Sequence, residues 1–214
     1  PLVILTVLAF CMAGLEATFA LWTERQLHWG VREVSIFFLY IGGIMVFVQG
    51  GMVRPLAKRL GEGKLVIAGT LLMSIGYATV LFVFAPPLAF VGGAFIAVGF
   101  GLANPSLTAL ISRNAPDEHQ GAAMGASQSA QSLCRILGPI MAGAAFTGFG
   151  RDAPYLAGAI ILFIGFLIAV RRLGVNAPRQ FPGSVSFTPP DAATHNHLKI
   201  PGGAGTRQTP TTPS

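Results

Sequence analysis

The sequence predicts an all-α membrane protein with six transmembrane helices. Its 214 residues are 52% hydrophobic and only 10% charged, whereas a soluble domain carries roughly 25% charged residues because its surface faces water. A chain with so few charges must expose much of its surface to lipid. The apolar residues form long runs without the two-residue alternation of barrel strands, which favours helices.

Six apolar stretches approach or exceed the roughly 20 residues that a spanning helix needs. They cover about residues 2–22, 34–53, 65–85, 87–112, 121–147 and 154–171. We therefore expect one membrane domain over residues 1–172. Residues 173–214 are rich in Pro, Gly, Thr and Ser and lack apolar runs, a composition that predicts a disordered tail.

The chain begins with Pro1 inside an apolar run, without an initiator Met or a preceding loop. A secretory signal peptide would show a basic region and a small-residue cleavage site. Neither pattern is present at the start of the sequence. We expect that the complete protein extends further upstream.

The basic residues of the connections predict the orientation, because cytoplasmic loops carry an excess of Lys and Arg. One side holds eight, namely Arg54, Lys58, Arg59, Lys64, Arg113, Arg171, Arg172 and Arg179. The other side holds three, Arg25, Arg32 and Arg151. The sequence thus predicts a cytoplasmic C-terminus, a basic cytoplasmic loop over residues 54–64 and a multi-pass protein of the plasma or inner membrane.

Composition and motifs exclude several other classes of protein. The net charge of +6 comes from these short basic clusters and does not indicate nucleic-acid binding. Cys11 and Cys134 fall inside apolar runs and are expected to be packing residues. No phosphate-binding loop, zinc motif or nucleophile elbow is present, so we expect neither an enzyme nor a cofactor or metal site.

Two charges lie deep in the predicted helices, Glu16 in the first and Arg135 in the fifth. Such a group costs at least about 2.5–3.5 kcal/mol to insert, so it usually faces a cavity or a partner. Each lies some 20 Å along its helix at 1.5 Å per residue, which allows a structural salt bridge. The alternative is that Glu16 carries protons, because an isolated carboxylate removed from water tends to bind one, whereas a nearby cation keeps it ionised.

The fifth helix carries a polar stripe of four residues spaced three and four apart, Gln128, Gln131, Ser132 and Arg135. At 100° per residue they share one face of the helix. Such a stripe faces either a water-filled substrate cavity or a neighbouring helix to which it hydrogen-bonds. We expect a substrate cavity, lined also by Phe19 near Glu16 and by Asn104.

Proline interrupts two of the predicted helices. Asn104-Pro105 follows Gly99 and Gly101 in the fourth helix, and Gly138-Pro139 lies in the fifth. Proline removes a backbone donor and clashes with the preceding turn. These residues are either harmless kinks or flexible points that serve gating.

These residues also carry a family resemblance. Gly14–Trp22, His28–Gly30 and Gln49–Val53 resemble the seventh and eighth helices of major facilitator superfamily drug exporters, with tetracycline-resistance-type antiporters as the closest likeness. Asn104–Leu107 and the stretch from Gln120 to Pro139 resemble the tenth and eleventh helices. Gly51–Gly61 is similar to the cytoplasmic loop motif of the superfamily, although Ala57-Lys58 stands near the place of its usual Asp. The resemblance covers about residues 2–172.

The resemblance implies that this chain is one half of a twelve-helix protein whose N-terminal six-helix half is missing here. A small molecule would bind between the halves and move by alternating access. Proton-coupled efflux of a small organic compound or drug is the expected function. Uptake symport and a non-transporting scaffold or receptor remain as alternatives.

Overall fold

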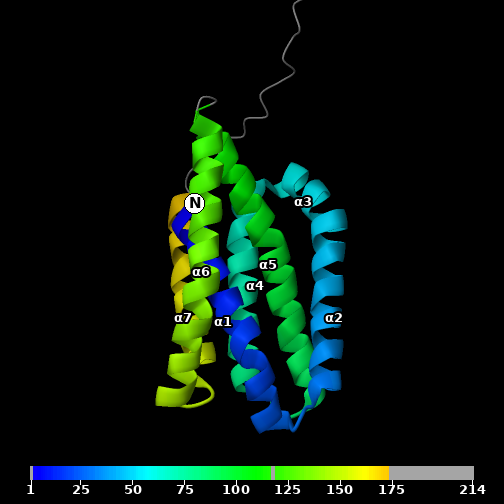
Figure 1. The fold of residues 1–214 in the computed structure, drawn as a ribbon. Helices are drawn as coiled ribbons and strands as arrows, with labels where there is room; N and C mark the ends of the chain where they lie inside the picture. The colour runs from blue at the N-terminus through cyan, green and yellow to red at the C-terminus, as the bar shows by residue number, and fades with distance from the viewer. Residues whose placement is uncertain (1, 117–118, 174–214) are drawn as a thin grey trace, which may run out of the picture. The chain divides into compact units, whose positions relative to one another are not determined.

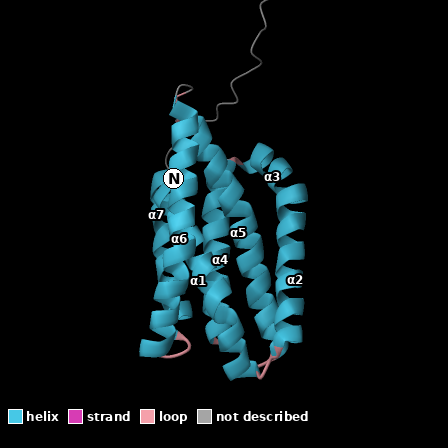
Figure 2. Cartoon of the chain, in the orientation of Figure 1, coloured by secondary structure: helices cyan, strands magenta, loops and turns pink. Residues whose placement is uncertain are grey.

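A computed structural model describes residues 2–116 and 119–173, which form a bundle of helices without strands (Figures 1 and 2). In chain order these are α1 (Leu2–Leu27), α2 (Val31–Phe47), a π-helical turn η1 (Val48–Met52), α3 (Val53–Leu60), α4 (Glu62–Leu81), α5 (Pro86–Asn114), α6 (Gln120–Phe149) and α7 (Ala153–Leu173). The expected tail lies outside the described residues, apart from Leu173 at its start.

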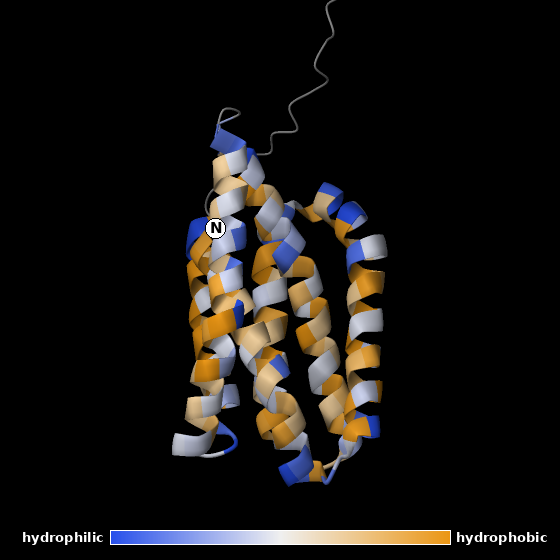
Figure 3. Cartoon of the chain, in the orientation of Figure 1, coloured by the Kyte–Doolittle hydropathy of each residue, from blue (hydrophilic) through white to orange (hydrophobic). Residues whose placement is uncertain are grey.

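Six helical segments of the described chain are long and apolar enough to cross a membrane, which confirms the predicted number. The segment α2–η1–α3 forms one of them, Val31–Leu60. Apolar residues dominate the middle of the helices and polar residues gather toward the ends (Figure 3).

Two helix ends differ from the prediction. α1 continues through Thr23–Leu27, and the expected loop 54–64 is mostly helical as α3 and the start of α4. Polar residues mark where a helix leaves the hydrocarbon, not where its backbone hydrogen bonding ends. The turn between α3 and α4 is instead set by Gly61, whose φ of 85° is the left-handed conformation that favours glycine.

The central helices α4 and α5 pack through pairs of glycines. A Cβ atom on Gly69 would lie 2.5 Å from the Gly99 carbonyl oxygen, and one on Gly76 would lie 2.8 Å from that of Gly92. Both distances are too short for any side chain. The absence of side chains lets the two backbones touch, as transmembrane helix packing in lipid requires.

The outer helices join this centre in two groups (Figure 1). α1 packs along α6 and also contacts α7, which lies against α4, whereas α2 lies against α5. α1 is the most buried of the spans, and α2 and α6 are the least buried. The exposed surface therefore lies mainly on α2 and α6.

We expect Gly99→Ala to lower the melting temperature of the detergent-solubilised protein by about 2–12 °C, because an added methyl group at this crossing costs about 1–3 kcal/mol. Gly42→Ala is the matched control, since no atom of another helix lies within 4 Å of a Cβ at that position. Equal effects of the two substitutions would show that the α4–α5 contact does not limit stability.

Candidate functional site

The polar stripe of α6 lies beside its contact with α1. Gly138 sits where the helices cross, and a Cβ there would lie 2.9 Å from the Ala13 Cβ atom. Ser127 and Cys134 are buried, and the Cys134 thiol is 3.5 Å from the Thr6 carbonyl oxygen. This contact fixes the rotation of α6 about its axis.

The four polar residues lie largely outside that contact. Gln128, Ser132 and Arg135 are exposed, and Gln131 is partly buried. The Gln131 side-chain amide donates a hydrogen bond to the Ser127 carbonyl oxygen at 3.5 Å. Three of the four side chains thus face away from the described helices. They contact water, lipid or another part of the protein.

Glu16 is exposed although α1 is the most buried span. Its exposed neighbours Ala17 and Ala20 have small side chains and leave the carboxylate uncovered. Glu16 and Arg135 interact electrostatically. Among the described residues, however, the ion pairs within 4.0 Å join Arg113 to Glu62 and Arg151 to Asp152, so Glu16 and Arg135 do not form a direct salt bridge.

The two charges also differ in depth, because α6 starts further along the bundle axis than α1. Gly14 lies beside Gly138, with 3.7 Å between a Cβ on Gly14 and the Gly138 carbonyl oxygen. Glu16 follows Gly14 by two residues, whereas Arg135 precedes Gly138 by three. At 1.5 Å per residue this five-residue offset is about 8 Å along the parallel helices.

Phe19 differs from the expectation that it lines a cavity. Its side chain is 1% exposed and stacks on Phe37 of α2 with 4.1 Å between ring centroids. Trp22 and Trp29 also contact it. Phe19 therefore belongs to an aromatic core that joins α1 to α2, and the open face of α1 is formed by Glu16 and its alanine neighbours.

Asn104 is partly buried on α5, and its side-chain oxygen is buried without a hydrogen-bond partner among the described residues. An unsatisfied buried acceptor is unfavourable, so this oxygen is a potential ligand contact. α5 continues through Pro105, and α6 continues through Pro139.

The candidate gating glycines lie at close helix contacts. A Cβ atom on Gly99 would lie 2.5 Å from the Gly69 carbonyl oxygen, and one on Gly101 would lie 3.1 Å from Val48 Cγ1. Gly138 makes the α1–α6 contact described above. Packing alone therefore accounts for the small size of these residues, and their role in gating stays a prediction.

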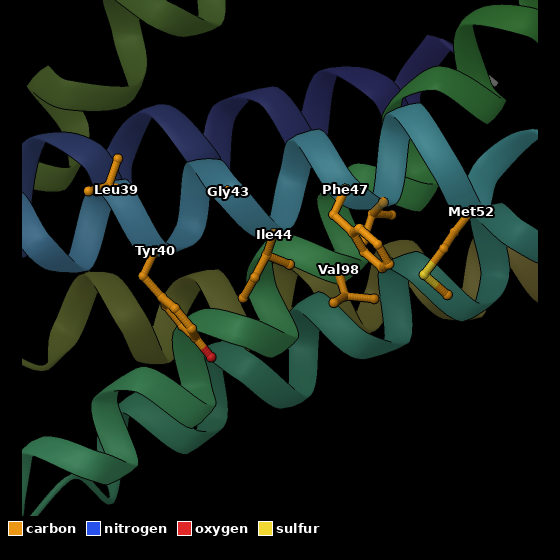
Figure 4. Close-up of a pocket in the computed structure, with 8 residues that line it drawn as sticks. Leu39, Tyr40, Gly43, Ile44, Phe47, Met52 and Val98 are labelled. Carbon is orange, nitrogen blue, oxygen red and sulfur yellow. The ribbon is translucent and has the colours of Figure 1, made fainter.

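An apolar groove of about 560 Å³ runs between α2 and α5 (Figure 4). Its lining residues are Leu39, Tyr40, Gly43, Ile44, Phe47, Val48, Met52 and Val98. Sequence reasoning missed this groove, because apolar residues in a spanning helix can face lipid, a partner helix or a ligand. The adjacent Gly42-Gly43 and the aromatic residues Tyr40 and Phe47 were the available signals.

A second feature missed by the sequence is a hydrogen-bonded link between α1 and the start of α7. The Trp22 indole donates to Asp152 Oδ1 at 3.0 Å, and the hydroxyl oxygens of Thr18 and Tyr155 lie 3.3 Å apart. Thr18 also donates to the Gly14 carbonyl oxygen. These bonds hold α1 and α7 together near the end that carries Arg151.

The sequence profile of the Major Facilitator Superfamily matches residues 2–196. The chain belongs to this superfamily. Its members are transporters and not enzymes, which confirms the expected class. The all-helical fold with six spanning helices matches part of the superfamily fold, as the sequence resemblance implied.

Known relatives extend well beyond the matched region. The class C tetracycline resistance protein of Escherichia coli is 29% identical over 159 residues, covering 72% of this chain and 40% of the relative. The human hippocampus abundant transcript-like protein 1 is 24% identical over 180 residues, covering 74% of this chain and 35% of the relative. The matched part of the chain thus spans well under half the length of these relatives.

A solved structure supports the fold. The human organic anion transporter MFSD10 (TETRAN) superposes with a TM-score of 0.74 at 20% identity, covering 78% of this chain and 39% of that transporter. Identity at this level establishes the fold alone. The sequence likeness to tetracycline resistance proteins is confirmed independently by the relative from Escherichia coli.

The stripe on α6 can be tested by cysteine reactivity in the complete membrane-embedded protein. Single cysteines replacing Gln128, Ser132 or Arg135 should react readily with a water-soluble thiol reagent if the stripe lines an aqueous cavity. A cysteine replacing the buried Ser127 is the control on the same helix and should react much more slowly. Equal protection at all four positions would favour hydrogen bonding to another helix.

Proposed function

We propose that the chain is the C-terminal half of a secondary transporter that exports a small organic compound in exchange for protons. The observation that carries the proposal is the pair Glu16 and Arg135, two exposed charges on adjacent helices at membrane depth without a direct salt bridge. Charges in such a position usually line an ion or substrate pathway.

The exposed surface formed by Glu16 on α1 and the polar stripe on α6, here called the open face, supports a site shared with a second half. Gln128, Ser132 and Arg135 offer hydrogen bonds and a positive charge, and the exposed side chains of Leu133 and Ile136 beside them on α6 offer apolar surface. A small organic molecule with a polar group needs both kinds of contact. A preceding six-helix half would close this face, and substrate would bind between the halves near the membrane midplane.

Glu16 is the proposed proton carrier. A carboxylate near a cation stays ionised, and it binds a proton when the cation turns to another partner. Substrate binding at Arg135, or a change in the distance between α1 and α6, would alter this balance. Proton coupling then follows because the two conformations differ in proton affinity, which is the requirement for a proton to bias the equilibrium between them.

The basic residues support a location in the plasma or inner membrane with the C-terminus in the cytoplasm. Arg54, Lys58, Arg59 and Lys64 lie at the α3–α4 end of the bundle, and Arg171 and Arg172 end α7. A Cβ on Gly63 would lie 3.5 Å from Leu173, so α4 begins where α7 ends. This arrangement gathers the basic residues at one end, as the positive-inside rule requires.

Cysteine labelling in intact cells tests this orientation. A cysteine replacing the exposed His28 should react with an impermeant reagent added outside the cell, whereas one replacing the exposed Lys58 should react only after the membrane is permeabilised. The reverse pattern would contradict the proposed topology.

Transport can be tested in proteoliposomes that contain the complete protein, with tetracycline and an organic anion as first probes and an imposed pH gradient. Glu16→Gln keeps the size of the side chain and removes its titration, so we expect normal expression, loss of pH-driven movement and retention of probe binding. Arg135→Gln alone should weaken binding of an anionic probe. Probe movement in the same direction as protons would indicate uptake symport.

A structural salt bridge predicts a different pattern. Glu16→Gln would then lower expression by leaving Arg135 uncompensated, and Glu16→Gln with Arg135→Gln would restore both expression and transport. Transport by this double variant at the parent rate and with the parent pH dependence would refute the proton-carrier role. If no pH gradient moves any probe in the parent protein, a scaffold or receptor becomes the better hypothesis.

A further inference from the structure

α3 has an apolar face that is already covered by protein. Val53, Leu56 and Ala57 pack against a small core formed by Val48, Leu65 and Leu102 of η1, α4 and α5. α3 lies at the end of α2, where the chain turns toward α4 (Figure 1). These contacts hold the short helix in one orientation at the end of a membrane span.

The opposite face of α3 is basic and exposed. Arg54, Lys58 and Arg59 project from it, and Lys64 is exposed near the start of α4. At 100° per residue the three α3 cations cover an arc opposite Val53, Leu56 and Ala57. The packing of the apolar face thus presents three positive charges outward.

No acid among the described residues neutralises these cations. The chain contains no Asp or Glu between Glu33 and Glu62. Glu62 pairs with Arg113, with 3.1 Å between Oε1 and Nη2. Within the described parts of the chain, Arg54, Lys58, Arg59 and Lys64 form no ion pair. An anion from outside the described helices is therefore the natural partner.

We propose that the basic face of α3 binds the headgroups of anionic phospholipids in the adjacent membrane leaflet. Guanidinium and ammonium groups both bind phosphate oxygens. Basic segments next to a membrane span are attracted to anionic leaflets. Each Lys or Arg strengthens the binding about fivefold. α3 is placed at that level because it directly continues the span of α2.

The covered apolar face determines how this contact works. A free amphipathic helix binds membranes largely by burying its apolar face among lipid chains. α3 cannot do so without leaving Val48, Leu65 and Leu102. Its interaction with lipid is therefore electrostatic and should weaken steeply with salt, because the screening length falls from about 8 Å at 0.15 M to about 3 Å at 1 M.

The test uses the complete protein in detergent with a bimane label on Leu60→Cys, since Leu60 is 50% exposed at the end of α3 and both native cysteines are buried. Dioctanoyl-phosphatidylglycerol should change the fluorescence saturably, and dioctanoyl-phosphatidylcholine should not. Lys58→Gln with Arg59→Gln should weaken the apparent affinity roughly 30-fold.

Arg32→Gln with Arg151→Gln is the matched control, because it removes the same charge from exposed residues in the first turn of α2 and in the α6–α7 connection. Its affinity should stay within about twofold of the parent protein, since these residues lie a membrane span away from α3 and beyond the screening length.

Equal losses in the two double variants, equal responses to the two lipids, or binding that is insensitive to salt would overturn the proposal. A full response to inorganic phosphate alone would indicate a free-anion site instead. No saturable response in the parent protein would also overturn the proposal, as expected if an acidic segment of the protein already covers α3.

Discussion

Close backbone contact between helices is the constraint on which this bundle depends. Lipid chains are as apolar as the helix surfaces, so burial of apolar area does not hold spanning helices together as it does in water. Gly69 and Gly99 let α4 and α5 touch, and Gly14 and Gly138 do the same for α1 and α6. Each contact also sets how its helices are rotated and how far one is shifted along the other.

The proposed function depends on that rotation and shift. Because Gly138 faces α1, Cys134 one helical turn earlier is buried against α1 as well. Arg135 follows Cys134 and is exposed on the other side of the helix. The same contact places Glu16 and Arg135 at different depths, close enough to influence each other and too far apart for a direct bond. Gly138, one of the candidate gating glycines, therefore affects the geometry of the candidate site through the α1–α6 contact.

The number of spans, the helical class and the family were predictable, because length, hydropathy and motif residues determine them locally. Helix ends were less predictable, since Thr23–Leu27 and Arg54–Leu60 are polar and still helical. The core position of Phe19 was not predictable, because a helix in lipid is apolar on all sides and periodicity cannot identify its packed face. Glu16 and Arg135 are 119 residues apart in sequence. Their offset depends on how α1 and α6 align in the folded protein, which no local sequence pattern predicts.

Among the described residues, Arg135 and the cations of α3 both lack a direct ion pair, and the energetics of the two sites differ. At an effective dielectric constant near 20, two unit charges attract by about 2 kcal/mol at a separation of about 8 Å, which for Glu16 and Arg135 is the offset along the helix axes alone. Inserting both into hydrocarbon costs about 5–7 kcal/mol on insertion scales. The attraction between Glu16 and Arg135 is therefore too weak to offset the cost of exposing both charges to lipid. Water, a bound proton, substrate or a second half must contact these residues instead. The cations of α3 would carry no such cost at the headgroup level that we propose for them. An unpaired charge at membrane depth thus requires a further partner, whereas the unpaired charges of α3 only attract one.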